Sequence, residues 1–158
     1  MRLTTLSLAV TATLATALPA SADVFGHWLT EKVEGGKQMI VEITPCGASA
    51  CGNIAWMSDP LGDNGQPQLD INNVDDSLKS RTLCGAAMIG DFTKDGEGKW
   101  SGGFIYAPDD GETYKSLMRL TSEGNLYVKG YIGIALFGIA PIGRSQVWTR
   151  ADGNRGGC

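Results

Sequence analysis

Apolar and polar residues alternate along several short runs of the chain, most clearly from Lys99 to Leu120. The first half of this segment is rich in aromatic and β-branched residues, which favour the half-buried surface of a sheet. From Tyr114 onward, every second residue falls on the same face of a strand. Between the halves, Pro108 presets φ at a turn position and Gly111 supplies a residue with positive φ. The segment therefore predicts an antiparallel hairpin.

Shorter runs with the same period of two recur on both sides of this hairpin. With the hairpin they amount to about eight strands, and the spacing of such strands is typical of an all-β barrel or sandwich. The 22 glycines fit tight turns between short strands. Eight strands can enclose an interior that side chains fill, or one that holds a small ligand. The further strands are expected at residues 39–44, 52–57, 83–92, 126–134 and 144–150.

The segment from Ser58 to Arg81 breaks this pattern, because it is polar and has no apolar period. We expect a long loop, in which Asp75 or Asp76 caps a short helix that ends near Ser80. The acidic residues also suggest a calcium site, but Val74 stands where the EF-hand spacing needs an oxygen ligand. Solvated turn residues are therefore the preferred interpretation of these acids.

Residues 1–22 have the composition of an export signal. Arg2 precedes an apolar stretch, and the small residues of Ala20–Ala22 match an Ala-x-Ala cleavage site. The apolar stretch is short for a membrane span of roughly 20 residues. We therefore expect a secretory signal peptide over residues 1–22, cleaved between Ala22 and Asp23. One domain over residues 23–158, without a transmembrane anchor, would then fold in the periplasm or outside the cell.

Charge and cysteine content narrow the classes of partner. The chain has 13 Lys and Arg against 17 Asp and Glu, and no basic stripe, which disfavours nucleic acid as a partner. Four cysteines in an exported chain predict disulfides. A Cys46–Cys51 bond would staple a hairpin and Cys84–Cys158 would form the second pair, although four cysteines allow three pairings. The metal-ligand spacing for zinc is absent, and we expect neither a metal nor a cofactor.

Several stretches of the sequence, taken together and in order, resemble a bacterial family catalogued as domain of unknown function 2147. The resemblance covers nearly all of residues 23–158 and implies an exported protein with a lipocalin-like, up-and-down β-barrel. It implies no catalytic residues. Two features depart from the family pattern, namely the apolar length of Leu136–Gly143 and the pair Cys84 and Cys158. The matching stretches are Gly26-x-Trp28, Val41–Met57, Asp70–Arg81, Lys99–Tyr114, Leu126–Gly133 and Gln146–Arg150.

Trp28 and Arg150 stand near the two ends of the predicted barrel. The first and last strands of a closed barrel meet. Arg150 can then stack on the Trp28 ring and seal the barrel floor by a cation–π contact. The resemblance likewise implies structural closure residues at these positions. The alternative is that Trp28 is simply a core residue.

The preferred function is binding of a hydrophobic or lipid-like small molecule inside the barrel. Tyr114 and Ser116 would orient a polar head group, while Met88 and Met118 would adapt to the shape of the ligand. The residues expected to line the interior are Ile54, Trp56, Met88, Ile105, Tyr114, Ser116, Met118, Val128 and Ile132.

Two other functions compete with this one. A filled barrel would make the protein an interaction or envelope-structural module that works through its outer surface. Phe137, Ile139 and the long polar loop would be its contacts, and a homodimer is among the options. An enzyme ranks third. His27 is the only common general base, and the carboxylates of residues 109–112 occupy a turn tip where they are solvated.

Overall fold

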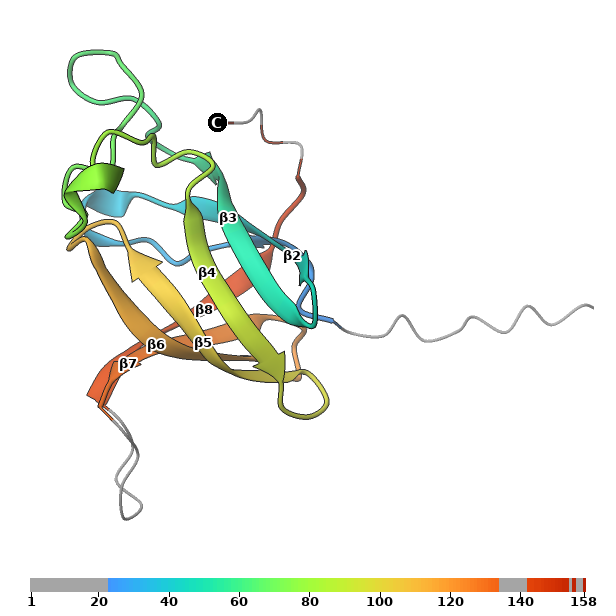
Figure 1. Ribbon diagram of the computed structural model, residues 1–158. Helices are drawn as coiled ribbons and strands as arrows, with labels where there is room; N and C mark the ends of the chain where they lie inside the picture. The colour runs from blue at the N-terminus through green and yellow to red at the C-terminus, as the bar shows by residue number, and fades with distance from the viewer. Residues whose placement is uncertain (1–22, 134–141, 154, 156–157) are drawn as a thin grey trace, which may run out of the picture.

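The computed structural model describes residues 23–133, 142–153, 155 and 158, in which eight antiparallel strands close into one barrel. Each strand pairs with the next along the chain, and β1 (Gly26–Leu29) pairs with β8 (Ile142–Arg150) to close the wall (Figure 1). The predicted all-β, up-and-down barrel is confirmed. The other strands are β2 (Met39–Cys46), β3 (Ser49–Met57), β4 (Ala87–Lys94), β5 (Lys99–Ala107), β6 (Glu112–Leu120) and β7 (Leu126–Ile132).

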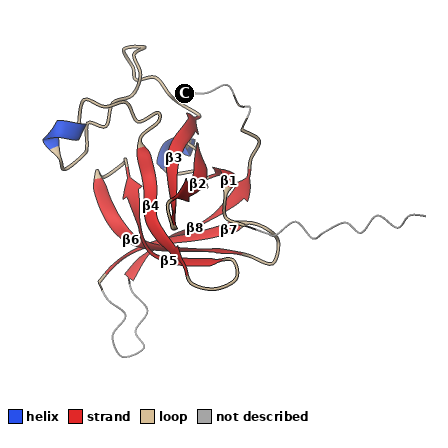
Figure 2. Cartoon of the chain, turned by 45° about the vertical axis from the view of Figure 1, so that its right-hand side comes forward, coloured by secondary structure: helices blue, strands red, loops and turns tan. Residues whose placement is uncertain are grey.

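Helical residues are confined to two 3-10 turns, η1 (Glu34–Gly36) and η2 (Asp76–Leu78), in the part of the chain shown in colour in Figure 2. Neither is long and apolar enough to cross a membrane. Asp75 caps η2 by accepting a hydrogen bond from the Ser77 backbone N–H at 2.9 Å. The predicted cap is therefore present, but the predicted short helix is only a single 3-10 turn.

Some expectations concern residues outside the described ranges. The signal peptide over residues 1–22 is one of them. The contacts expected of Phe137 and Ile139 are another, since residues 134–141 lie outside the description as well.

The β5–β6 hairpin forms as the alternation predicts. Tyr106 lies opposite Thr113 and Ala107 opposite Glu112, and the backbone N–H of Gly111 donates to the Ala107 carbonyl at 2.8 Å. Gly111 has φ of 75°, the left-handed conformation expected at the exit of the turn. A Cβ at this position would lie 1.8 Å from the carbonyl oxygen of Asn72. Glycine is required here by the backbone conformation and by the long loop that packs against the turn.

The barrel has a closed end and an open end. The short β2–β3, β4–β5 and β6–β7 turns lie at the closed end, whereas the long β3–β4 connection and the β5–β6 turn lie at the open end (Figure 1). Buried apolar side chains, most of them large, fill the closed half, and their burial supplies the main favourable free energy of folding. These residues include Trp28, Val41, Ile43, Ala50, Phe92, Trp100, Met118, Leu126 and Trp148.

Arg150 covers the closed end from outside. Its guanidinium carbon lies 4.0 Å from the centroid of the buried Trp28 ring, and its Nη1 donates to the Phe25 carbonyl at 2.6 Å. A second donor, Nη2, bonds the carbonyl of Asp23. Gly26 has φ of 111°, and a Cβ there would approach Arg150 Nη1 to 3.0 Å. The Gly-x-Trp motif therefore makes room for the arginine that stacks on its tryptophan.

A β-bulge changes the face on which Trp56 lies. Val41 pairs with Ile54 and Ile40 pairs with Trp56, so Ala55 is an extra residue in β3. The extra residue shifts the alternation, and Met57 rather than Trp56 joins Ile54 in the core cluster. Trp56 instead lies half-buried on the wall, with the Arg155 guanidinium 5.7 Å from its ring centroid.

The long β3–β4 connection is held to the barrel by a buried carboxylate. Asp70 is 1 % exposed, and its Oδ2 accepts hydrogen bonds from Arg81 Nε at 2.9 Å and from Asn73 Nδ2 at 2.8 Å. Its Oδ1 accepts the Tyr106 hydroxyl from β5. Asn72 adds a bond from its side-chain nitrogen to the Pro108 carbonyl at 3.1 Å. The loop is thus fixed across the β5–β6 turn at the rim of the open end.

Two disulfides join the four cysteines. Cys46–Cys51 spans the β2–β3 turn with a Cα–Cα distance of 5.8 Å, and Cys84–Cys158 spans 5.3 Å. These are the two pairs favoured by the sequence, out of the three pairings that four cysteines allow. The second bond ties the last residue of the chain to the end of the long loop.

Candidate functional site

The open half of the barrel encloses a cavity of about 390 Å³. This volume lies in the range of about 300–1,000 Å³ that small-molecule sites occupy. The cavity begins above the packed floor, where Val128 and Trp148 form part of its lining, and it ends at the rim formed by residues 107–110. The barrel interior is therefore packed at one end and hollow at the other.

Five of the nine residues expected to line the interior are brought together around this cavity. Apolar side chains make up most of its wall, and Tyr114 adds a hydroxyl. The five residues are Met88, Ile105, Tyr114, Val128 and Ile132.

The other four expected residues lie elsewhere. Ile54 and Met118 are buried in the packed core at 1 % exposure each, below the cavity. Ser116 is fully buried, and its hydroxyl donates to the Lys129 carbonyl at 3.0 Å, so it stabilises the β6–β7 pair. Trp56 lies on the wall because of the bulge at Ala55. None of these four belongs to the lining of the cavity.

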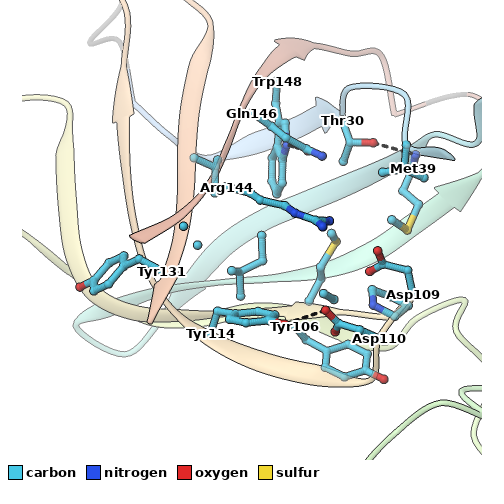
Figure 3. A pocket seen from close by; sticks show the side chains of 18 of the residues that line it. Thr30, Met39, Tyr106, Asp109, Asp110, Tyr114, Tyr131, Arg144, Gln146 and Trp148 are labelled. Atoms are coloured by element: carbon cyan, nitrogen blue, oxygen red, sulfur yellow. Dashed lines mark hydrogen bonds between the residues drawn. The ribbon is translucent and has the colours of Figure 1, made fainter. Parts of the chain in front are cut away.

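Strand β8 contributes polar lining residues that the sequence interpretation did not single out. Arg144 and Gln146 share the inward face of β8 with the buried Trp148, two residues apart each time. Figure 3 shows the Arg144 side chain extending into the space between Trp148 and Tyr114. The period of two across residues 144–148 contains this information, once Trp148 is recognised as an inward residue.

Tyr114 is oriented by the turn at the mouth of the cavity. Its hydroxyl donates to Asp110 Oδ2 at 2.6 Å (Figure 3), and Asp110 Oδ1 accepts the backbone N–H of Glu112 at 2.9 Å. The hydrogen bond to the Asp110 carboxylate raises the pKa of Tyr114, because it stabilises the neutral phenol as a donor. The Asp110 carboxylate is thereby engaged by two donors.

A second, wider hollow of about 1160 Å³ separates the long loop from the barrel. Its lining includes loop residues such as Gln66 and Gln68. It shares four lining residues with the inner cavity, namely Val33, Met39, Pro108 and Asp109. The two spaces therefore meet at the rim of the barrel.

Among residues 23–133, 142–153, 155 and 158, no three His, Cys, Asp or Glu side chains are grouped so that they could hold a metal ion. His27 lies at the closed end, where its Nε2 is 3.7 Å from Glu42 Oε1, and is therefore remote from the cavity. The chemistry that the cavity offers is recognition by apolar contact and by a few hydrogen-bond donors.

Comparisons with known proteins agree with the barrel architecture. The solved structure of HP1028 from the human pathogen Helicobacter pylori, a protein described as belonging to the lipocalin family, matches with a TM-score of 0.67. The sequence identity is 23 %, over 82 % of this chain and 83 % of that chain, so the similarity shows a shared lipocalin-like fold. The comparison with curated proteins finds no match.

Family membership follows from the sequence match. Residues 26–150 match the family described as "Uncharacterized protein conserved in bacteria (DUF2147)". The match begins at the glycine of Gly26-x-Trp28 and ends at Arg150, so it spans every strand of the barrel. The chain is a member of the bacterial DUF2147 family.

Proposed function

We propose that the protein binds a hydrophobic or lipid-like small molecule in the open half of its barrel. The observation that carries this proposal is the cavity of about 390 Å³, walled by Met88, Ile105 and Val128 above a packed floor. A ligand that fills this space removes apolar surface from water, which contributes about 25 cal/mol per Å². The lipocalin-like fold supports the proposal, since barrels of this size can hold one small ligand.

The competing function, an interaction module with a filled barrel, is disfavoured by the same cavity. A filled interior needs side chains that reach across the open half. In the open half a cavity of about 390 Å³ remains between the walls, up to the rim formed by residues 107–110.

Native mass spectrometry of the freshly purified protein tests the proposal. The wild-type chain should carry an additional mass that is lost when the protein is denatured. Val128→Trp fills the cavity from β7 and should abolish this additional mass. Val147→Trp is the matched control, because Val147 is 38 % exposed on the neighbouring strand whereas Val128 is 2 % exposed.

Two outcomes would overturn the proposal. The first is an identical ligand content in Val128→Trp and in the wild type, with both proteins folded by circular dichroism. The second is an empty wild-type protein that also fails to bind laurate or dodecanol when these are added.

We further propose that the protein acts after export, in the periplasm or outside the cell. Two disulfides support this location, because such bonds persist in oxidising compartments. N-terminal peptide masses of the protein from cell fractions test it. A mature chain that begins at Asp23 and occurs outside the cytoplasm is expected, and an uncleaved cytoplasmic chain would contradict the proposal.

A further inference from the structure

Arg144 distinguishes the cavity from a purely apolar one. Arg81 forms an ion pair, and the guanidinium groups of Arg119, Arg150 and Arg155 each lie over an aromatic ring. Arg144 has no ion pair, hydrogen bond or aromatic partner among the described residues, yet it lines the cavity. Its side chain extends into this space rather than away from the barrel (Figure 3). A positive charge with five N–H donors is therefore available to a bound molecule.

Gln146 adds a neutral donor beside this charge. The indole Nε1–H of Trp148 donates to Gln146 Oε1 at 2.6 Å. Because an indole N–H can only donate, this bond fixes which end of the amide is the oxygen. The Gln146 NH₂ group is then left at the cavity wall on the same face of β8 as Arg144. The two side chains thus present donors, not acceptors, to a ligand.

Two carboxylates at the rim limit the charge of that ligand. Asp110 is engaged by the Tyr114 hydroxyl and by the Glu112 backbone, and Asp109 lies next to it in the cavity lining. Like charges repel, so a group with two negative charges is penalised near this rim more than a group with one. A carboxylate carries one negative charge and matches the planar fork of a guanidinium.

Building on the proposed function, we propose that the ligand is an amphipathic monocarboxylate. Its carboxylate pairs with Arg144 and accepts a hydrogen bond from the Gln146 amide. Its alkyl chain packs against the apolar wall formed by Met88, Ile105 and Val128. The proposed ligand therefore has a carboxylate that contacts Arg144 and Gln146 of β8. Its alkyl chain is short enough to fit a cavity of about 390 Å³.

Calorimetric titration with matched probes tests this assignment. Laurate carries the carboxylate, dodecanol has a chain of the same length with a neutral head, and dodecylamine carries a positive head. Wild-type protein should bind laurate more tightly than dodecanol, and dodecanol more tightly than dodecylamine. Arg144→Met keeps an apolar side chain of similar length and should weaken laurate binding about ten-fold or more, while leaving dodecanol binding unchanged.

Two further variants serve as controls. Arg144→Lys keeps the charge but loses the planar fork, so its laurate affinity should fall between those of the wild type and Arg144→Met. Arg119→Met removes an exposed arginine that lies over Tyr127, with its guanidinium carbon 4.6 Å from the ring centroid, and should bind all three probes as the wild type does. Unfolding temperatures measured for each variant verify that it is folded.

The outcomes separate the two proposals. If the wild type binds both laurate and dodecanol but Arg144→Met weakens neither, or weakens both equally, the head-group assignment is overturned and the apolar site stands. Tighter binding of dodecylamine than of laurate would also overturn the assignment, because the rim carboxylates rather than Arg144 would then determine which head group binds. If the wild type binds none of the probes, both proposals fail.

Discussion

The same strands build the two halves of the barrel, yet one half is solid and the other is hollow. Along β8 the inward face carries Trp148 in the closed half and Arg144 in the open half. Along β4 it carries Phe92 in the closed half and Met88 in the open half. The β7–β8 pairing runs without interruption from Leu126↔Trp148 to Ile132↔Ile142, so on β8 the difference comes from side chains four residues apart and not from the backbone. On β4 the register with β3 also shifts between Gly52 and Asn53, near the end that carries Met88.

This difference separates two physical tasks. The closed half is packed with side chains and has no room for a ligand. Its buried tryptophans and Phe92 contribute to stability through apolar burial and dispersion. The open half is less well packed and contains the cavity. Polar side chains line this cavity, although a packed core would exclude them. Stability is therefore expected to depend on the closed half and recognition on the open half.

Truncation of an apolar side chain should show the largest contrast. Phe92→Ala removes a fully buried ring and should cost about 3–5 kcal/mol of unfolding free energy. Ile105→Ala removes a half-buried side chain that faces the cavity and should cost about 1 kcal/mol. Urea unfolding measures both values. Equal losses would show that the two halves are packed alike.

The two disulfides should contribute unequally to stability. Cys84–Cys158 closes a loop with a sequence separation of 74, whereas Cys46–Cys51 has a separation of 5. From the chain entropy of the unfolded state, the first bond should contribute about 4 kcal/mol and the second about 2 kcal/mol. Paired Cys→Ser variants and unfolding in the presence of a reductant measure these values. An unchanged melting temperature in reductant would contradict the expectation.

Release of the long loop should loosen the open half alone. Arg81→Met leaves the buried Asp70 carboxylate without its cation and should cost about 2–3 kcal/mol, less than a fully buried pair because the Arg81 side chain is 30 % exposed. Backbone amides of residues 68–83 should exchange faster with solvent, while those of β2 stay protected. Lys79→Met is the control. It removes an exposed pair with Asp76 and should cost less than about 1 kcal/mol.

Alkaline pH should lower the stability of the fold through the ionisation of Tyr106. Burial, and then the hydrogen bond to Asp70, raise the pKa of Tyr106 to about 12 from the ordinary value of 10.0. The unfolded chain therefore loses this proton at lower pH than the folded protein, so stability falls as pH rises from 10 to about 12. Tyr106→Phe should show a shallower fall over this interval. Parallel pH profiles for the two proteins would assign the dependence to other groups.

Local patterns in the sequence were sufficient to predict most of the fold. Period-two alternation located the β5–β6 hairpin, and the turn chemistry of Pro108 and Gly111 fixed its exit. Such signals act between neighbouring residues, so one sequence contains them in full. The bulge at Ala55 left no such signal, and as a result the alternation placed Trp56 on the wrong face.

The candidate site was harder to predict because it depends on distant contacts. The cavity exists only after eight strands close, and its depth depends on where the floor ends. The Asp70–Arg81 ion pair has no recognisable pattern in the sequence. Its contribution to stability comes from the burial of Asp70 against Tyr106 of β5, a residue distant along the chain. The position of Arg144 could have been predicted from the sequence, because its spacing from Trp148 puts both side chains on one face of β8.

Methyl NMR during a titration with laurate tests most directly whether one half of the barrel receives a ligand while the other half stays solid. The methyl signals of Ile105 and Val128 should shift in a saturable manner, because both side chains line the cavity. Those of Val41 and Ile43, buried at 0 % and 1 % exposure in the core, should stay in place. Shifts of equal size in both groups, or no shift in either, would contradict the account.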